Sequence, residues 1–149
     1  MAKGAGYTEL DYIDVRPDTH RYEAESADVN DAAIRHYHWN EFPDYVGGVD
    51  RGTSSVEFTV DAPRAGSYLV DIGYANGLAQ EADHVVSVDG TAVGTVRYQS
   101  TGAWLSTPKQ DAVLGTATVR LTLYAGANRI RLAKGQGYAE VDWLALRTG

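Results

Sequence analysis

The feature that most constrains this chain is an alternation of apolar and polar residues, which recurs along most of its length. In the run Ser54–Val60, the apolar residues Val56 and Phe58 share a face with Val60, because successive strand side chains point to opposite sides. Asp89 and Gly90 form a dipeptide typical of a two-residue hairpin turn. Similar runs occupy residues 67–74, 84–88, 91–98, 116–124, 129–133 and 140–146. No segment has a convincing helical period, so we expect an all-β sandwich or barrel.

Three longer loops interrupt this alternation, at residues 27–44, 75–83 and 99–111. The first loop contains Tyr37 and Trp39, and the third contains Trp104. Binding residues tend to lie on loops that a rigid scaffold positions. We therefore expect any binding surface to be built from these loops.

Length, charge and cysteine content exclude several classes of protein. The 149 residues suit one domain, and the absence of cysteine excludes a disulfide framework. The net charge of -7 repels phosphate backbones, so we expect no nucleic-acid partner. No apolar stretch approaches the roughly 20 residues that span a bilayer, so we expect no membrane partner. The first residues lack the apolar region of a signal peptide, so for an exported parent we expect an excised piece.

The start of the chain repeats a pattern found near its end. Residues 2–12 resemble residues 133–143 at a constant offset of 131, with matched glycine, tyrosine, glutamate and aspartate positions. We interpret residues 1–20 as the last strand of a preceding tandem copy plus a linker, and residues 21–149 as the module itself. A spare terminal strand could also pair in a neighbouring molecule, as in domain swapping. A coincidental strand motif is the alternative.

Carboxylates are grouped at both ends of the predicted module. In a strand, Glu23 and Glu25 would point to the same face, and Asp142 on the last strand is a possible third member. Neighbouring carboxylates repel each other unless water or a cation screens them, and calcium takes several such oxygens together with main-chain carbonyls. The alternative is a solvated strand face without a metal.

An ordered set of short motifs resembles carbohydrate-binding modules of families 6 and 35, and is most similar to family 35. The resemblance covers residues 21 to 147 and is carried by residues 22–25, 45–50, 54–60, 65–68, 74–77, 88–90, 123–132 and 137–142.

The resemblance implies a β-sandwich with a jelly-roll topology of two antiparallel sheets and a structural calcium ion. The ligands that it implies are Glu23, Glu25 and Asp142, with main-chain oxygens near Asp50 and Arg51 completing the shell. The ion would then hold the first strand of the module to the last.

A sugar site needs an aromatic platform together with polar groups. Trp104 is the first candidate platform, and the resemblance implies an aromatic contact in its loop. Tyr37 and Trp39 are candidates for the opposing wall, and the amide of Asn76 for a hydroxyl contact. Glu140 and Tyr138 complete the set, although related family 6 modules often have asparagine where this chain has Glu140. Packing of these aromatic residues against the scaffold, and a turn role for Asn76, are the alternatives.

We therefore expect a non-catalytic, extracellular module that directs a parent enzyme or array to a polysaccharide. Uronic-acid, galactose or mannose, and α-glucan ligands all remain open, and the expected partners in the parent protein are a catalytic domain and sister modules. A calcium-stabilised adhesion module without a glycan is the alternative. A glycosidase would need two carboxylates across a cleft, and a metal site on His36 and His38 with His20 or His84 has weak support.

Overall fold

The structure, a computed structural model, describes residues 20–35, 45–105 and 114–148. Its strands are β2 (His20–Glu23), β3 (Asp28–Asn30), β4 (Ala33–Arg35), β5 (Tyr45–Gly47), β6 (Ser55–Ala62), β7 (Gly66–Ala75), β8 (Ala82–Val88), β9 (Thr91–Tyr98), β10 (Gly115–Leu123), β11 (Gly126–Lys134) and β12 (Glu140–Thr148). One 3-10 turn, η2 (Ala24–Ser26), follows β2.

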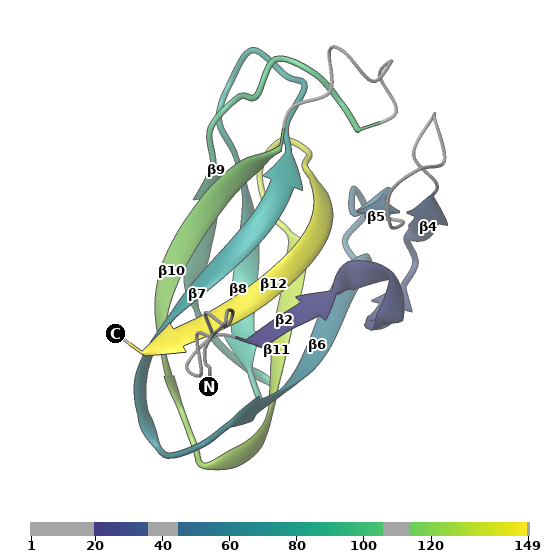
Figure 1. Ribbon diagram of the computed structural model, residues 1–149. Helices are drawn as coiled ribbons and strands as arrows, with labels where there is room; N and C mark the ends of the chain where they lie inside the picture. The colour runs from purple at the N-terminus through teal and green to yellow at the C-terminus, as the bar shows by residue number, and fades with distance from the viewer. Residues whose placement is uncertain (1–19, 36–44, 106–113, 149) are drawn as a thin grey trace, which may run out of the picture.

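The strands form two sheets that face each other (Figure 1). One sheet has the order β10-β7-β12-β5-β4, with β2 also paired to β12, and the other has the order β3-β6-β11-β8-β9. Every pairing between these strands is antiparallel. The predicted sandwich of two antiparallel sheets is therefore confirmed.

The core lies between the sheets and is built from the alternating residues. Val56, Phe58 and Val60 are at most 1% exposed, as their spacing predicts. On β10 the pattern is less regular, because Val119 is only partly buried while Leu121 is 4% exposed. The buried face of each sheet thus follows from the period of two, since each strand turns one set of side chains inward.

Two predicted local structures are wrong. Part of the expected loop at residues 27–44 forms the short strands β3 and β4, which pair with β6 and β5. Strands of three residues are too short to show an alternating pattern, and their place depends on distant partners. Glu25 also lies in η2 and not in a continuous strand with Glu23.

In the part of the chain that the structure describes, no helix is long and apolar enough to cross a membrane.

Candidate functional site

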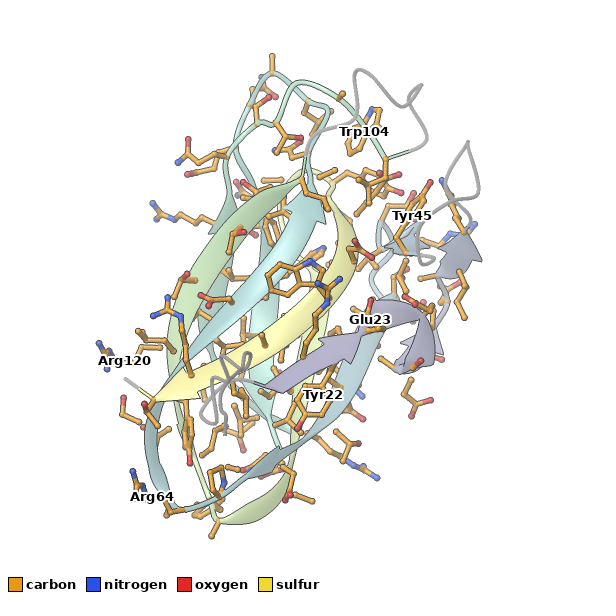
Figure 2. The ribbon with its side chains drawn as sticks, in the orientation of Figure 1. Tyr22, Glu23, Tyr45, Arg64, Trp104 and Arg120 are labelled. Carbon is orange, nitrogen blue, oxygen red and sulfur yellow. The ribbon has the colours of Figure 1, made fainter. Side chains whose placement is uncertain are left out.

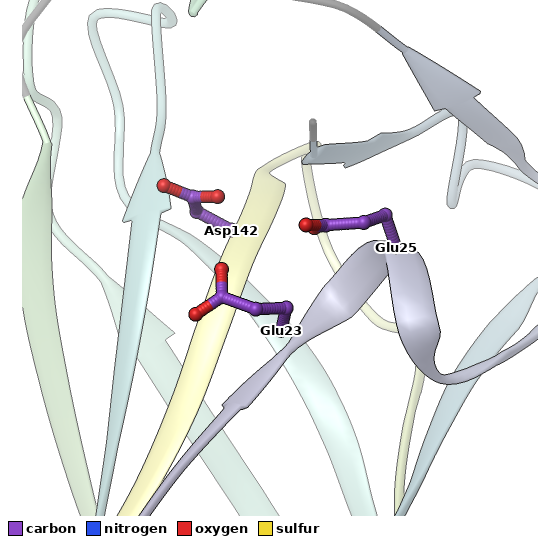
Figure 3. Close-up of side chains that lie close together, drawn as sticks. All are labelled: Glu23, Glu25 and Asp142. Carbon is purple, nitrogen blue, oxygen red and sulfur yellow. The ribbon is translucent and has the colours of Figure 1, made fainter. Parts of the chain in front are cut away.

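Three acidic side chains from both ends of the module meet beside β12. Glu23 ends β2, Glu25 lies in η2, and Asp142 belongs to β12. One oxygen from each residue lies within 4.8 Å of the others, and Figure 3 shows the three carboxylates turned toward a common space. We call these three residues the carboxylate cluster.

Two irregularities in the backbone bring the cluster together. The 3-10 turn η2 carries Glu25 back toward Glu23. The turn thus brings together the two carboxylates that strand alternation was expected to place on one face. On β12, Val141 pairs with Tyr74 and Trp143 pairs with Gly73, which leaves Asp142 as an extra residue in a β-bulge. A bulge re-aims side chains at a strand position, and here the bulged residue is the one that joins the cluster.

The cluster suits a hard cation. Glu23 Oε2 accepts a hydrogen bond from Arg21 Nε at 2.7 Å, whereas Glu23 Oε1 is buried and accepts none among the described residues. Glu25 Oε1 and Asp142 Oδ1 are also shielded from solvent. Two oxygens on opposite sides of a calcium ion would be about 4.8 Å apart, given bonds of about 2.4 Å. The donor set and its spacing therefore fit calcium.

Arg51, the fourth predicted metal ligand, has other contacts. Its main-chain oxygen accepts a hydrogen bond from Ser54 N at 2.9 Å, and its Nη1 lies 3.2 Å from Asp31 Oδ1. Arg51 therefore stabilises the loop in which it lies. Among the described residues, no contact joins Arg51 to the carboxylate cluster.

A second group of candidate residues lies at the end of the sandwich that carries Trp104 (Figure 2). The rings of Trp104 and Tyr138 are 5.1 Å apart between centroids, with planes at 63°. Tyr138 Oη accepts a hydrogen bond from Gly48 N at 2.6 Å, which fixes one ring. Both residues are partly buried. The two rings therefore meet at an angle, and the Tyr138 ring is the one held in place. We call these two residues the aromatic pair.

Gly77 determines where the indole lies. A Cβ added at Gly77 would be 2.5 Å from Trp104 Cε2, so the ring packs directly over the glycine backbone. Sequence reasoning missed this role, although the Asn76-Gly77 dipeptide at a strand end was a signal for a special backbone position.

Asn76 is not a surface residue, and the expectation of a sugar contact there is corrected. Its side chain is 0% exposed. Its Nδ2 donates to the carbonyl oxygens of Gln80 and Tyr98, and its Oδ1 accepts from Leu78 N. The amide therefore holds the loop after β7 against the end of β9, and offers no group to a ligand.

Glu140 is buried as well, at 2% exposed, and supports the loop of Trp104 from below. Its Oε1 accepts a hydrogen bond from Leu105 N at 2.7 Å. Burial raises the pKa of the Glu140 carboxyl, while this hydrogen bond and the charge of Arg35 act to lower the pKa. A direct sugar contact does not match this placement, so we treat Glu140 as a positioning residue for the loop.

The remaining predicted wall, Tyr37 and Trp39, lies outside the described residues. The same holds for His36 and His38 and for the side chain of His20. The described neighbour on that side is Arg35, whose Nε would lie 3.1 Å from a Cβ added at Gly47. An exposed guanidinium thus lies near the aromatic pair, since Tyr138 Oη would be 3.0 Å from the same Cβ.

The fold is the β-sandwich of two antiparallel sheets that carbohydrate binding modules have. Residues 20–149 match the carbohydrate binding module family 35. The chain therefore belongs to this family, and its predicted resemblance is confirmed. A family 35 carbohydrate binding module from Clostridium thermocellum has a similar structure, with a TM-score of 0.71 and 27% sequence identity over 88% of this chain and 98% of that one.

Curated relatives are enzymes that act on sugars. The chain is 34% identical to an exo-beta-D-glucosaminidase of Amycolatopsis orientalis over 97% of its own length and 13% of the enzyme. It is 33% identical to a 1,6-alpha-glucosyltransferase of Sporosarcina globispora over 99% of its length and 12% of the enzyme. The chain thus spans about one eighth of the length of each of these two relatives.

Proposed function

We propose that this chain is a non-catalytic, calcium-stabilised module that binds an α-1,6-linked glucan for an extracellular parent enzyme. The observation that carries the proposal is the aromatic pair, Trp104 and Tyr138, which meet at 63° at the loop end of the sandwich.

The angle of the aromatic pair favours a bent ligand over a flat one. Sugar rings pack their C–H faces on aromatic rings, and polar edges then need hydrogen-bonding groups nearby. An extended, flat chain would lie best on coplanar rings. A corner instead suits one sugar unit and a chain that turns away from it, as the flexible α-1,6 linkage allows.

The relatives support the ligand class. One of them is named as a 1,6-alpha-glucosyltransferase, and it aligns with 99% of this chain. The aligned part is an eighth of that enzyme, which matches a targeting role next to a separate catalytic domain.

Two features support binding without catalysis. A glycosidase needs a pair of carboxyl groups on either side of the scissile bond. The carboxylate cluster converges on one space suited to a cation, and one oxygen of each carboxylate is shielded from solvent. Glu140 is also buried, with its carboxylate bonded to the main chain of Leu105.

In this proposal the carboxylate cluster holds calcium, which supplies positive charge where three carboxylates would otherwise repel each other. The cation joins β2 and η2 to β12, so it stabilises the module and takes no part in a reaction. This role places the ion in the scaffold, apart from the aromatic pair.

The test is isothermal titration calorimetry with isomaltohexaose, with cellohexaose as the flat comparison. We expect binding of isomaltohexaose and at least tenfold weaker binding of cellohexaose. Trp104→Ala should abolish binding. Tyr124→Ala is the matched control, because Tyr124 is 71% exposed in the turn between β10 and β11, which lies at the other end of the sandwich from the loop after β9 (Figure 1).

A second pair of variants tests the placement of the indole. Gly77→Ala should push Trp104 out of position and weaken binding by tenfold or more, with the fold retained. Gly52→Ala is its control, since a Cβ there meets nothing within 4 Å. Unchanged affinity in Trp104→Ala would remove the aromatic pair from the site.

β-linked glucosamine is a second candidate ligand, supported by the net charge of -7 and by the glucosaminidase relative. If the chain binds chitosan hexamer and not isomaltohexaose, and if added salt weakens that binding, the ligand is β-linked glucosamine.

A further inference from the structure

A hollow adjoins the aromatic pair on the side of Tyr138. It lies between β4 and the loop that joins β5 to β6, and it has a volume of about 280 Å³. Arg35 Nε and Tyr138 Oη lie 3.1 Å and 3.0 Å from the same point, the place of a Cβ added at Gly47. The hollow therefore begins at the hydroxyl of Tyr138. We call it the polar pocket, and the residues that line it include Arg35, Gly48, Asp50 and Arg51.

Asp31 joins the two walls of the polar pocket. It follows β3 on one wall, and its carboxylate accepts hydrogen bonds from the other wall, from Arg51 Nη1 at 3.2 Å and from Thr53 Oγ1. Ser54 Oγ also donates to the main-chain oxygen of Asp31 at 2.6 Å. These bonds fix the two walls relative to each other. The groups of the pocket are therefore positioned before a ligand binds, which reduces the entropy lost on binding.

Two oppositely charged side chains of the polar pocket do not bond to each other. Arg51 is paired with Asp31. Arg35 and Asp50 are both exposed, and neither takes part in an ion pair between described residues. Both charges act on the hydroxyl of Tyr138: burial raises the pKa of this group, the charge of Arg35 lowers the pKa, and the charge of Asp50 raises it. A guanidinium and a carboxylate are thus both available to a ligand beside this hydroxyl.

These groups match two neighbouring hydroxyls of a sugar ring. A guanidinium only donates hydrogen bonds and a carboxylate only accepts them, whereas a hydroxyl does both. One sugar hydroxyl can therefore accept from Arg35 while the next one donates to Asp50. Tyr138 Oη accepts from Gly48 N at 2.6 Å and donates to none of the described residues, so its own hydrogen is a third group for the ligand.

The charge balance of the polar pocket favours a neutral ligand over an acidic one. Two arginines, Arg35 and Arg51, are matched by two aspartates, Asp31 and Asp50. An anion would be attracted by Arg35 and repelled by Asp50, and it would also lose its hydration. The volume of about 280 Å³ is at the small end of the range for ligand pockets, so the pocket suits a single sugar unit.

We propose that the polar pocket is a second sugar subsite, in which Arg35 and Asp50 bind the hydroxyls of a neutral hexose unit. The preceding unit of the ligand lies on the aromatic pair, so the module binds two consecutive units. This proposal rests on the proposed function, because the aromatic pair has to hold the first unit. It adds the residues that select the second unit and the chemistry of that unit.

The experiment measures the gain in affinity that the second sugar unit brings. The full chain is titrated with methyl α-D-glucoside and with isomaltose, and its indole signals are followed by nuclear magnetic resonance. We expect isomaltose to bind about tenfold more tightly than methyl α-D-glucoside. Arg35→Met and Asp50→Asn should each reduce this ratio to about twofold or less, because each removes a hydrogen bond to a charged group. The affinity for methyl α-D-glucoside should not change.

Matched controls make the same changes away from the polar pocket. Arg64→Met and Asp61→Asn replace exposed residues after and within β6, and Arg64 lies at the end of the sandwich away from Trp104 (Figure 2). Both variants should keep the ratio of the parent chain. D-glucuronate is the acidic probe, and we expect it to bind no more tightly than methyl α-D-glucoside.

Three results would overturn the proposal and leave the proposed function standing. One is the same tenfold ratio in the parent chain, in Arg35→Met and in Asp50→Asn. Another is an equal loss of affinity for both sugars, which would place these residues beside the first unit. The third is tighter binding of D-glucuronate that Arg35→Met removes, which would make the pocket an anion site. A parent chain that binds neither sugar would overturn the proposed function itself, and this proposal with it.

Discussion

His84 is a buried histidine that neither site uses. It is 1% exposed, its Nδ1 lies 2.9 Å from Tyr98 Oη, and the two rings meet edge to face at 78°. Burial lowers the pKa of His84 to about 4, with Asp83 acting to raise it and Lys134 to lower it. The folded protein therefore holds the imidazole neutral at a pH where an unfolded chain would protonate it.

This pKa difference makes stability depend on pH. An unfolded histidine has a pKa near 6.5. The stability that the neutral, buried His84 contributes is therefore complete above about pH 6.5 and is lost as the pH falls toward 4. As the pH falls through this window, we expect the unfolding equilibrium constant to rise by up to about tenfold per pH unit. Urea unfolding at several pH values measures the slope.

The control for this prediction is the double variant His84→Phe with Tyr98→Phe, which removes both hydrogen-bonding partners together. Its slope between pH 6.5 and 4 should be shallower than that of the parent chain by about one proton. Equal slopes would show that His84 does not titrate on unfolding.

At the scale of single residues, the sequence predicted which acidic side chains come together better than it predicted burial. Glu23, Glu25 and Asp142 do meet, with one oxygen of each within 4.8 Å of the others. Asn76 and Glu140 are polar and loop-adjacent, yet both are buried. Their burial depends on which loops lie over them, and single-sequence patterns contain no information on such contacts between distant loops.

Among the elements, β12 shows how one extra residue creates a site. Deleting Asp142 would remove the bulge and join Val141 directly to Trp143, so that the pairs Val141–Tyr74 and Trp143–Gly73 would continue as a regular ladder with residues 143–148 in their present register. We expect the deletion variant to keep a cooperative thermal transition while it loses the third carboxylate of the cluster. Asp142→Asn keeps the bulge and should keep the fold.

Near-ultraviolet circular dichroism and thermal melting of both variants check this prediction. A deletion variant without a cooperative melt, beside an Asp142→Asn variant that keeps one, would mean that the bulge is required for the register of β12.

The long strands were predictable because alternation and turn residues agree in them. The Asp89-Gly90 hairpin between β8 and β9 lies where the dipeptide predicts, with both residues at positive φ. The short strands β3 and β4 were not predictable, since each is held by hydrogen bonds to a partner strand ten or more residues away.

For the whole molecule, the main expectation is that calcium raises the melting temperature. A ligand at 100 times its dissociation constant stabilises the native state by about 2.7 kcal/mol. For a chain of this size we expect a rise of about 5–10 °C over the chelated protein. Differential scanning calorimetry with calcium, with magnesium and with a chelator measures the effect.

Glu23→Gln with Glu25→Gln is the control variant, and its melting temperature should not respond to calcium. A parent chain that melts at the same temperature with calcium and with chelator would show that the carboxylate cluster does not hold a calcium ion.

The pairing of β2 with β12 also determines how the module is attached. His20 and Leu146 lie side by side, so the chain enters and leaves the sandwich at one point, on the end away from Trp104 (Figures 1 and 2). A host protein can accept such a unit within a surface loop or at a terminus without changing the direction in which the unit faces. In either arrangement the attachment point lies at the far end of β12 from the aromatic pair, so under the proposed function a host domain would leave the aromatic pair uncovered.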